Sequence, residues 1–247
     1  MTQWYDKLPI RRDQLIWVVL GLVFAVLGIV KLGVVTFLTI IVSLVIGITV
    51  HECSHAWMAN LLGDPTAKLQ GRISLNPLRQ LDPAGTAMMA VTLATGVGIG
   101  WGRPTPVNPN RLKYGRRLGS ALVALAGPAS NILVATLAGI WLRFFSMPLW
   151  LGQLLLTITL MNSFLAMFNL LPIPPLDGFS ILIGLISLIP GEQVWRALNW
   201  VEGLARYGWM ILIGLLMLSQ FTSLNLLSRL IYWPASRLVL LITGYLL

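Results

Sequence analysis

The chain has 247 residues, of which 57% are hydrophobic and only 10% carry a charged side chain. A soluble globular domain has about 25% charged residues, so this composition excludes that class and indicates a membrane protein. The net charge of +9 does not indicate nucleic-acid binding, because the basic residues are spread over short segments between apolar runs. We expect these residues to face the anionic lipid of a bilayer.

The apolar runs have the lengths of membrane spans in the first part of the chain. Residues 15–30 form the first run, and we expect a retained span because no short apolar segment with a cleavage site is evident. Residues 33–62 form the second run, which ends at a Gly-Asp-Pro stop signal. Between 68 and 76 polar and apolar residues alternate. This period of two predicts a strand with one wet face.

The middle of the chain is less regular. Residues 83–100 form a short apolar run with basic residues on both sides. If both flanks are cytoplasmic, this piece re-enters the membrane or packs against the bundle, and a full crossing is the alternative. Residues 101–110 are proline-rich and should be extended. Two clear spans follow, at 118–142 and 149–171, and then shorter apolar stretches at 179–190, 207–219 and 224–247.

A bilayer crossing takes about 20 apolar residues, so the chain has room for about six transmembrane helices. We therefore predict an all-α polytopic membrane protein with a small membrane-associated β element at 68–76. Arg11 and Arg12 place the N-terminus in the cytoplasm. The alternating spans then bring His55 and Asp177 to similar depth near the cytoplasmic face.

Both histidines of the chain lie in His51-Glu52-Cys53-Ser54-His55, within the second apolar run. Residues four apart share one face of a helix, so two imidazoles can bind one ion from the same side. Ionisable groups inside a membrane helix are costly and mark functional sites. H-E-x-x-H is the pattern in which two histidines bind zinc and the glutamate acts as general base.

A catalytic zinc has three protein ligands and an open position for water, and the chain has no third histidine. Cys53 lies roughly 200° round the helix from each histidine and points away. Asp177 follows a membrane-length apolar run beside three prolines, and such irregular backbone is tolerated at membrane depth only against protein or a water-filled cavity. We therefore predict one zinc ion on His51, His55 and Asp177, with iron or cobalt as alternatives.

Further motifs accompany these residues: Gly71-Arg72 with Asn76-Pro77, Asp82-Pro83, Gly100-Trp101-Gly102-Arg103-Pro104 with Val107-Asn108-Pro109, Ala126-Gly127-Pro128 with Asn131, and Asn169-x-x-Pro172-x-Pro174-x-x-Asp177-Gly178. Together with H-E-x-x-H they resemble the site-2 protease family of intramembrane zinc metallopeptidases, in its short bacterial-type form without a PDZ domain. The resemblance covers about residues 45–180. One departure is Cys53-Ser54, where many members have an apolar residue and then glycine.

The resemblance implies a catalytic core at 33–190, between an N-terminal transmembrane segment at 1–32 and C-terminal transmembrane segments at 191–247. It implies a zinc metalloendopeptidase with one Zn²⁺ per chain and Glu52 as catalytic base. Asn169 would contact the scissile peptide or its oxyanion, with a helix-cap or turn role as the alternative. Asn131 is a weaker implication, and an interhelical hydrogen bond is its alternative.

The expected substrates are membrane proteins, cleaved within or near a transmembrane segment in regulated intramembrane proteolysis. The expected location is the lipid bilayer of a bacterial inner membrane, as an integral multi-pass protein; no nucleic-acid partner is expected, and the oligomeric state is open. The 68–76 strand and the 101–110 segment are candidate clamps for an unwound substrate, by β-addition. Structural cover is the alternative role for the strand.

A membrane metal-ion transporter or metal-binding protein is the alternative function, since it could use the same three ligands. Transport needs polar residues along a path to the far face, and the spans at 15–30 and 149–168 offer almost none. A catalytically dead relative is disfavoured because every expected catalytic position is filled.

Overall fold

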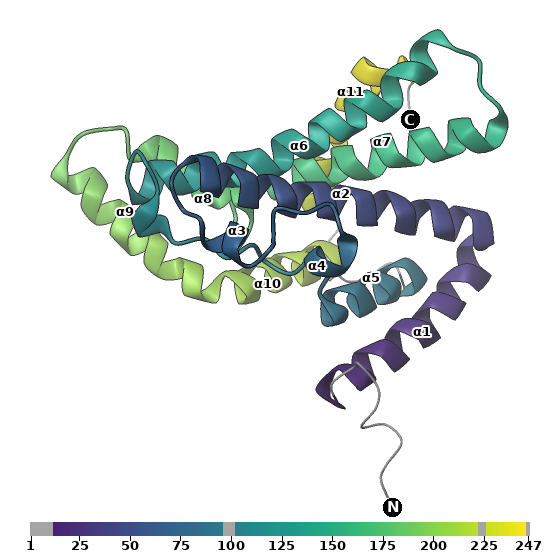
Figure 1. Ribbon diagram of the computed structural model, residues 1–247, viewed down its shortest axis with the longest axis horizontal. Coiled ribbons are helices and arrows are strands. Elements are labelled where there is room, and N and C mark those ends of the chain that lie inside the picture. The colour runs from purple at the N-terminus through teal and green to yellow at the C-terminus, as the bar shows by residue number, and fades with distance from the viewer. Residues whose placement is uncertain (1–11, 96–101, 222–225, 246–247) are drawn as a thin grey trace, which may run out of the picture.

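The computed structural model describes residues 12–95, 102–221 and 226–245, and within these ranges the regular structure is helical. The α-helices, labelled in Figure 1 where there is room, are α1 (Arg12–Leu32), α2 (Val34–Leu61), α3 (Thr66–Leu69), α4 (Pro77–Gln80), α5 (Pro83–Thr95), α6 (Arg116–Phe144), α7 (Leu149–Asn169), α8 (Asp177–Ile186), α9 (Glu192–Leu204), α10 (Gly208–Phe221) and α11 (Leu226–Thr243). Two 3₁₀ turns, η2 (Pro109–Arg111) and η3 (Ala205–Tyr207), complete the set.

A bundle of α2, α6 and α7 forms the centre of the molecule (Figure 1). These three helices are long and apolar enough to cross a membrane. Their outer faces expose large apolar side chains, whereas Ser43, Thr159, Asn162 and Ser163 are fully buried between them. A bundle in water would show the opposite distribution, so this polarity is that of a helix bundle packed in lipid, where polar groups hydrogen-bond between helices.

Helices α8 and α11 complete the packing around this bundle, α8 against α6, and α11 against both α6 and α7. The α6–α7 hairpin returns the chain to the end of the bundle at which α2 finishes (Figure 1). The second half of α2, the first half of α6 and the start of α8 therefore meet at one end of the molecule, as the predicted equal depth of His55 and Asp177 requires.

Helix α1 packs mainly along α5 and only slightly along α2, and Figure 1 shows the α1–α5 pair to one side of the bundle. The Nζ of Lys31 donates to the carbonyl of Ala94 at 3.2 Å, which ties the end of α1 to the end of α5. The 13 residues of α5 rise about 20 Å, less than the ~30 Å of a bilayer core. Residues 96–101 lie outside the described residues, so re-entry or crossing of 83–100 stays a prediction.

The predicted strand at 68–76 is wrong. Residues 66–69 form the helical turn α3, and the chain then reverses at Gly71, whose φ is +69°. Arg72 is 4% exposed, whereas Leu69 and Leu75 are 79% and 68% exposed, the reverse of the expected burial. The side-chain amide of Gln80 donates to the carbonyls of Arg72 and Ser74. A side chain thus takes the place of a partner strand, and no β edge forms for a substrate to join.

The extended segment predicted at 101–110 is confirmed for residues 102–108, which are followed by η2. Residue 101 lies outside the described residues. Gly102 forms an isolated antiparallel bridge with Leu81, and the backbone N–H of Arg103 donates to the carbonyl of Gln80 at 2.7 Å. The backbone N–H of Thr105 donates to the side chain of Glu52, so the extended segment passes beside the second half of α2.

The described residues confirm the predicted helical fold, and three of their helices are long and apolar enough to cross a membrane, against the about six predicted. The apolar stretches at 179–190 and 207–219 give helices shorter than a crossing, whereas α11 has 18 residues. Helix α8 ends early because Pro190 and Gly191 interrupt the chain after it. Helix α8 has 10 residues and α10 has 14. The number of crossings stays a prediction.

Candidate metal centre

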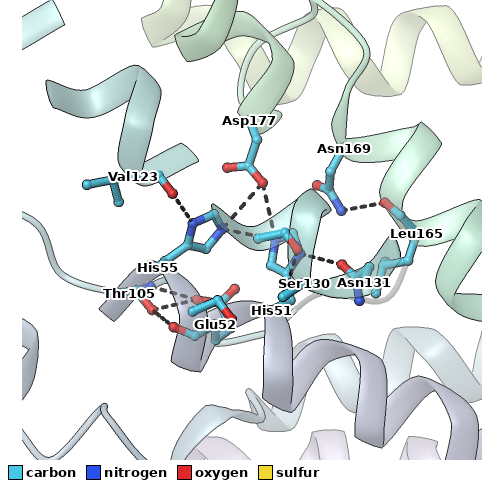
Figure 2. Close-up of polar contacts among 12 residues, drawn as sticks. His51, Glu52, His55, Thr105, Val123, Ser130, Asn131, Leu165, Asn169 and Asp177 are labelled. Carbon is cyan, nitrogen blue, oxygen red and sulfur yellow. Dashed lines mark hydrogen bonds and ion pairs between the residues drawn. The ribbon is translucent and has the colours of Figure 1, made fainter. Parts of the chain in front are cut away.

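Two helices bring three ligand-type side chains together (Figure 2). His51 and His55 lie one turn apart on the inward face of α2 and are 7% and 8% exposed. Asp177 is the first residue of α8, and its side chain points at the two imidazoles from the opposite side. The break in helix between α7 and α8, at 170–176, allows the chain to present this carboxylate to α2.

The three facing atoms form a nearly equilateral triangle. Nε2 of His51 lies 3.0 Å from Nε2 of His55, and Oδ2 of Asp177 lies 3.2 Å and 3.3 Å from these two nitrogens. Ligand atoms about 2.0–2.1 Å from a tetrahedral zinc ion lie roughly 3.3 Å apart. The triangle is therefore of the size that three ligands of one zinc ion require, with the fourth position open.

Hydrogen bonds to the other ring nitrogens determine which nitrogens can bind a metal. Nδ1 of His55 lies 2.8 Å from the backbone carbonyl of Val123, which can only accept. Nδ1 of His51 lies 2.6 Å from Oδ1 of Asn131. Both Nδ1 atoms therefore carry the hydrogen, and in the neutral rings each Nε2 presents a lone pair toward the centre of the triangle.

The orientation of the Asn131 amide is itself determined by buried partners. Its Nδ2 donates to the carbonyl of Gly47 at 3.1 Å and to Oδ1 of Asn162 at 3.0 Å. The amide of Asn162 is oriented in turn, because its Nδ2 donates to the carbonyl of Ile158. Since both backbone carbonyls only accept, this chain of bonds leaves the oxygen of Asn131 facing His51. Such support of a ligating histidine fixes its tautomer and ring orientation.

The arrangement leaves a buried acceptor without a donor. Oδ2 of Asp177 is buried and receives no hydrogen bond from the described part of the chain. Two imidazole lone pairs and one carboxylate oxygen converge, and a cation is what satisfies three such groups at once. The residues present fit a zinc ion, and Cys53 is not part of the cluster.

The backbone of α6 approaches the two imidazoles at Gly127. A Cβ at this position would lie 2.5 Å from Nε2 of His55 and 2.6 Å from Cε1 of His51. A side chain there would displace the rings, so glycine is required by the close approach of the helix. Gly178, beside Asp177, has the same role toward the carbonyls of Leu170 and Leu171.

Glu52 lies on α2 beside the triangle and is held by the extended segment (Figure 2). Its Oε2 accepts the backbone N–H of Thr105 at 3.0 Å and the hydroxyl of Thr105 at 2.7 Å. The guanidinium of Arg72 lies 4.0 Å from the same oxygen. A cavity of about 450 Å³ opens onto Glu52, both histidines and Asp177.

Asn169, the last residue of α7, also lines this cavity. Its Nδ2 donates to the carbonyl of Leu165, one turn earlier in the same helix, at 2.9 Å. This bond uses one of the two amide hydrogens and orients the side chain, so the helix-terminal contact and a role toward a substrate are compatible. The remaining wall is largely apolar and includes Leu165, Phe168, Trp209 and Leu212.

The structure thus brings His51, Glu52, His55, Asn169 and Asp177 around one cavity and places Asn131 behind His51, while the roles assigned to these residues stay predictions. Sequence reasoning did not find Thr105, Arg72 or Asn162 as parts of the site. The sequence does carry a signal for two of them. Asn162 is a polar residue inside the apolar span at 149–171, and Arg72 belongs to one of the motifs. Thr105 carries no signal, because its contact with Glu52 depends on the tertiary path of the extended segment.

Comparison with known proteins agrees with the geometry. Over 168 residues, 62% of this chain and 71% of the relative, the sequence is 38% identical to "Putative zinc metalloprotease YwhC" of Bacillus subtilis. The chain belongs to this site-2 protease-type family. It is also 27% identical over 201 residues to "Putative zinc metalloprotease Rip2" of Mycolicibacterium smegmatis, covering 80% of this chain and 73% of that one. No protein-family profile and no solved structure matches the chain.

Membership in the family makes the chain a metalloprotease, and the relatives imply Zn²⁺ as its cofactor. The apolar spans and the membership together make it a membrane protein.

Proposed function

We propose that this family member is an intramembrane zinc endopeptidase, which hydrolyses a peptide bond within or near a transmembrane segment of a membrane-protein substrate. The observation that carries the proposal is the triangle of two imidazole nitrogens and one carboxylate oxygen, formed between α2 and α8 beside Glu52 and a cavity. These residues lie on or against helices of membrane-spanning character, so a substrate would be met within the bilayer.

His51, His55 and Asp177 hold the zinc ion in this proposal. When bound, zinc acidifies water and polarises a carbonyl group. Glu52 accepts the proton of the attacking water and returns it to the leaving amine. Asn131 and the carbonyl of Val123 hold the imidazoles in the tautomer that presents Nε2. Asn169 offers its second amide hydrogen to the scissile peptide or to the developing oxyanion.

A transmembrane substrate must lose helical hydrogen bonds before its carbonyl can reach this centre. The extended segment at 102–108 is the remaining candidate clamp, since the 68–76 strand does not form. The largely apolar cavity wall suits an aliphatic or aromatic substrate side chain. Cleavage of such substrates is what regulated intramembrane proteolysis requires.

The proposal places the protein in a bacterial inner membrane as a multi-pass protein, with about six crossings and the site near the cytoplasmic face. Its partners are then the lipid bilayer and transmembrane substrates, and no nucleic acid. The catalytic core at 33–190 lies between the flanking segments 1–32 and 191–247.

The proposal is tested by cleavage of a model transmembrane substrate with purified, zinc-loaded protein in detergent. Wild type should cleave, and Glu52→Gln should lose cleavage by about 10²-fold or more while keeping its zinc, because only the base is removed. In liposomes, a metal-ion transporter would move zinc equally well with Glu52→Gln. Zinc transport without proteolysis in the wild type would refute the proposal.

A further inference from the structure

One carboxylate oxygen of Glu52, Oε2, accepts two hydrogen bonds from a single residue, Thr105. The backbone N–H of Thr105 donates to Oε2 with an N···O distance of 3.0 Å, and its hydroxyl donates to the same oxygen at 2.7 Å. The same hydroxyl oxygen lies 3.0 Å from the backbone carbonyl oxygen of Glu52, so Thr105 packs directly against this turn of α2. Figure 2 shows the two side chains paired at the lower edge of the metal centre.

The segment that carries Thr105 is anchored on both sides. Before it, the guanidinium of Arg72 donates to the carbonyls of Arg79 and Arg103, and the N–H of Arg103 donates to the carbonyl of Gln80. After it, the N–H of Asn108 donates to the fully buried carboxylate of Asp64 at 2.6 Å. Thr105 is therefore held between two anchors, neither of which is a hydrogen bond to Glu52.

The approach of this segment to α2 is close. A Cβ at Gly102 would lie 2.7 Å from Cγ2 of Ile48 and 3.5 Å from Cγ of Glu52. Arg72 adds a buried positive charge 4.0 Å from Oε2. Oε2 of Glu52 thus receives two hydrogen bonds from Thr105 in the extended segment and faces the positive charge of Arg72.

A glutamate side chain has three rotatable bonds, and a general base works only when its oxygen is within hydrogen-bond reach of the proton it accepts. With Oε2 fixed by two donors, the orientation of the carboxylate is set, and Oε1 is the oxygen left for the water. We propose that Thr105 is a positioning residue that holds Glu52 in the orientation for proton transfer. This inference rests on the proposed function of Glu52 as base.

A positioning role and a structural role make different predictions. If Thr105 acts through Glu52, the loss of its hydroxyl lowers kcat and leaves KM and zinc content unchanged. If Thr105 only holds the extended segment in place, its loss lowers the thermal stability or raises KM. A misplacement of about 1 Å can cost up to ~10²-fold in rate, and the backbone N–H of Thr105 remains in every variant.

The test compares Thr105→Val, which keeps the shape, with Thr105→Ser, which keeps the hydroxyl. Cleavage of a model transmembrane substrate by zinc-loaded full-length protein should show kcat lowered about 10- to 100-fold in Thr105→Val, and within about 3-fold of wild type in Thr105→Ser. Thr157→Val is the matched control, because the hydroxyl of Thr157 donates only to the carbonyl of Gln153 in its own helix, away from the cavity. Its kcat should equal that of wild type.

Wild-type kcat in Thr105→Val, or an effect confined to KM, would overturn the inference. If Thr105→Val has a melting temperature well below that of wild type, Thr105→Ala replaces it in the test. Folded, zinc-loaded Thr105→Ala protein with a wild-type kcat would also overturn the inference. An inactive wild type refutes the proposed function itself, whereas an active wild type with an unaffected Thr105→Val refutes only the role of Thr105.

Discussion

Oδ1 of Asn131 lies 2.6 Å from Nδ1 of His51, and this contact joins the middle of α6 to the metal-facing side of α2. Asn131 is fully buried and receives its own orientation from Gly47 and Asn162. The tautomer of His51 is thus determined by residues of three helices, and zinc affinity should depend on side chains that do not touch the ion.

Replacement of Asn162 with leucine should weaken zinc binding. Without its Oδ1, the amide of Asn131 loses one of its two acceptors and is free to turn its nitrogen toward His51. Loss of such outer partners costs about 10- to 100-fold in metal affinity. Zinc retention under competition with a chelator measures this directly. Thr136→Val is the control, since the hydroxyl of Thr136 donates to the carbonyl of Ile132 in its own helix; equal zinc affinity in wild type and both variants would contradict the prediction.

Gly127→Ala should disrupt the metal centre although it adds a single methyl group. The new Cβ would overlap the ring of His55 at 2.5 Å, so the ring or α6 must shift. The expected result is loss of both bound zinc and cleavage. Gly152→Ala in α7 is the matched control, because its Cβ would meet nothing closer than 4.0 Å. A zinc-loaded, active Gly127→Ala protein would show that the helices are less closely packed here than described.

These sites show what the sequence could and could not predict. His51 and His55 follow from helical spacing, and Asp177 from the short inventory of acidic residues in an apolar chain. The alternation at 68–76 does not give a strand, because one of its polar residues, Arg72, turns inward to bond the carbonyls of Arg79 and Arg103. Asn162 and Thr105 join the site through bonds to residues far along the chain, which local patterns do not encode.

The stability of the extended segment should depend on the ionised carboxylate of Asp64 and should fall in acid. Burial raises the pKa of this carboxyl, but the donors on Thr66 and Asn108 and the charge of Arg111 outweigh burial and lower the pKa below its ordinary value. A lowered pKa in the folded state stabilises the protein above the ordinary aspartate pKa of about 3.9, and this contribution is lost as the pH falls through the lower folded value.

Proteolysis within residues 102–108 should therefore stay slow at neutral pH and at pH 5, and rise only below about pH 4. Asp64→Asn should raise it at neutral pH and remove much of the acid dependence. An acid-active protease with a site engineered into this segment provides the measurement, and an acid transition identical in Asp64→Asn and wild type would exclude Asp64 as its source.

Helix α9 should depend on Arg117 for its docking against α6. The guanidinium of Arg117 donates to both carboxylate oxygens of Glu202, at 2.8 Å and 3.0 Å, and to Oδ1 of Asn199, and it stacks over Trp195 at 4.5 Å. Partly buried bidentate pairs are more stabilising than exposed ones. A double-mutant cycle of Arg117→Gln and Glu202→Gln, measured by thermal unfolding in detergent, should give a coupling of about 0.5–2 kcal/mol. Additive effects would mean that the pair does not hold α9.

We propose that one zinc ion is bound between α2 and α8 by His51, His55 and Asp177. The most direct test is the zinc content of purified wild type, Asp177→Ala and Glu52→Gln after dialysis against a chelator of graded strength. We expect about one zinc per chain in wild type and Glu52→Gln, and zinc affinity at least ~10-fold weaker in Asp177→Ala. Equal zinc retention in wild type and Asp177→Ala would contradict the proposal.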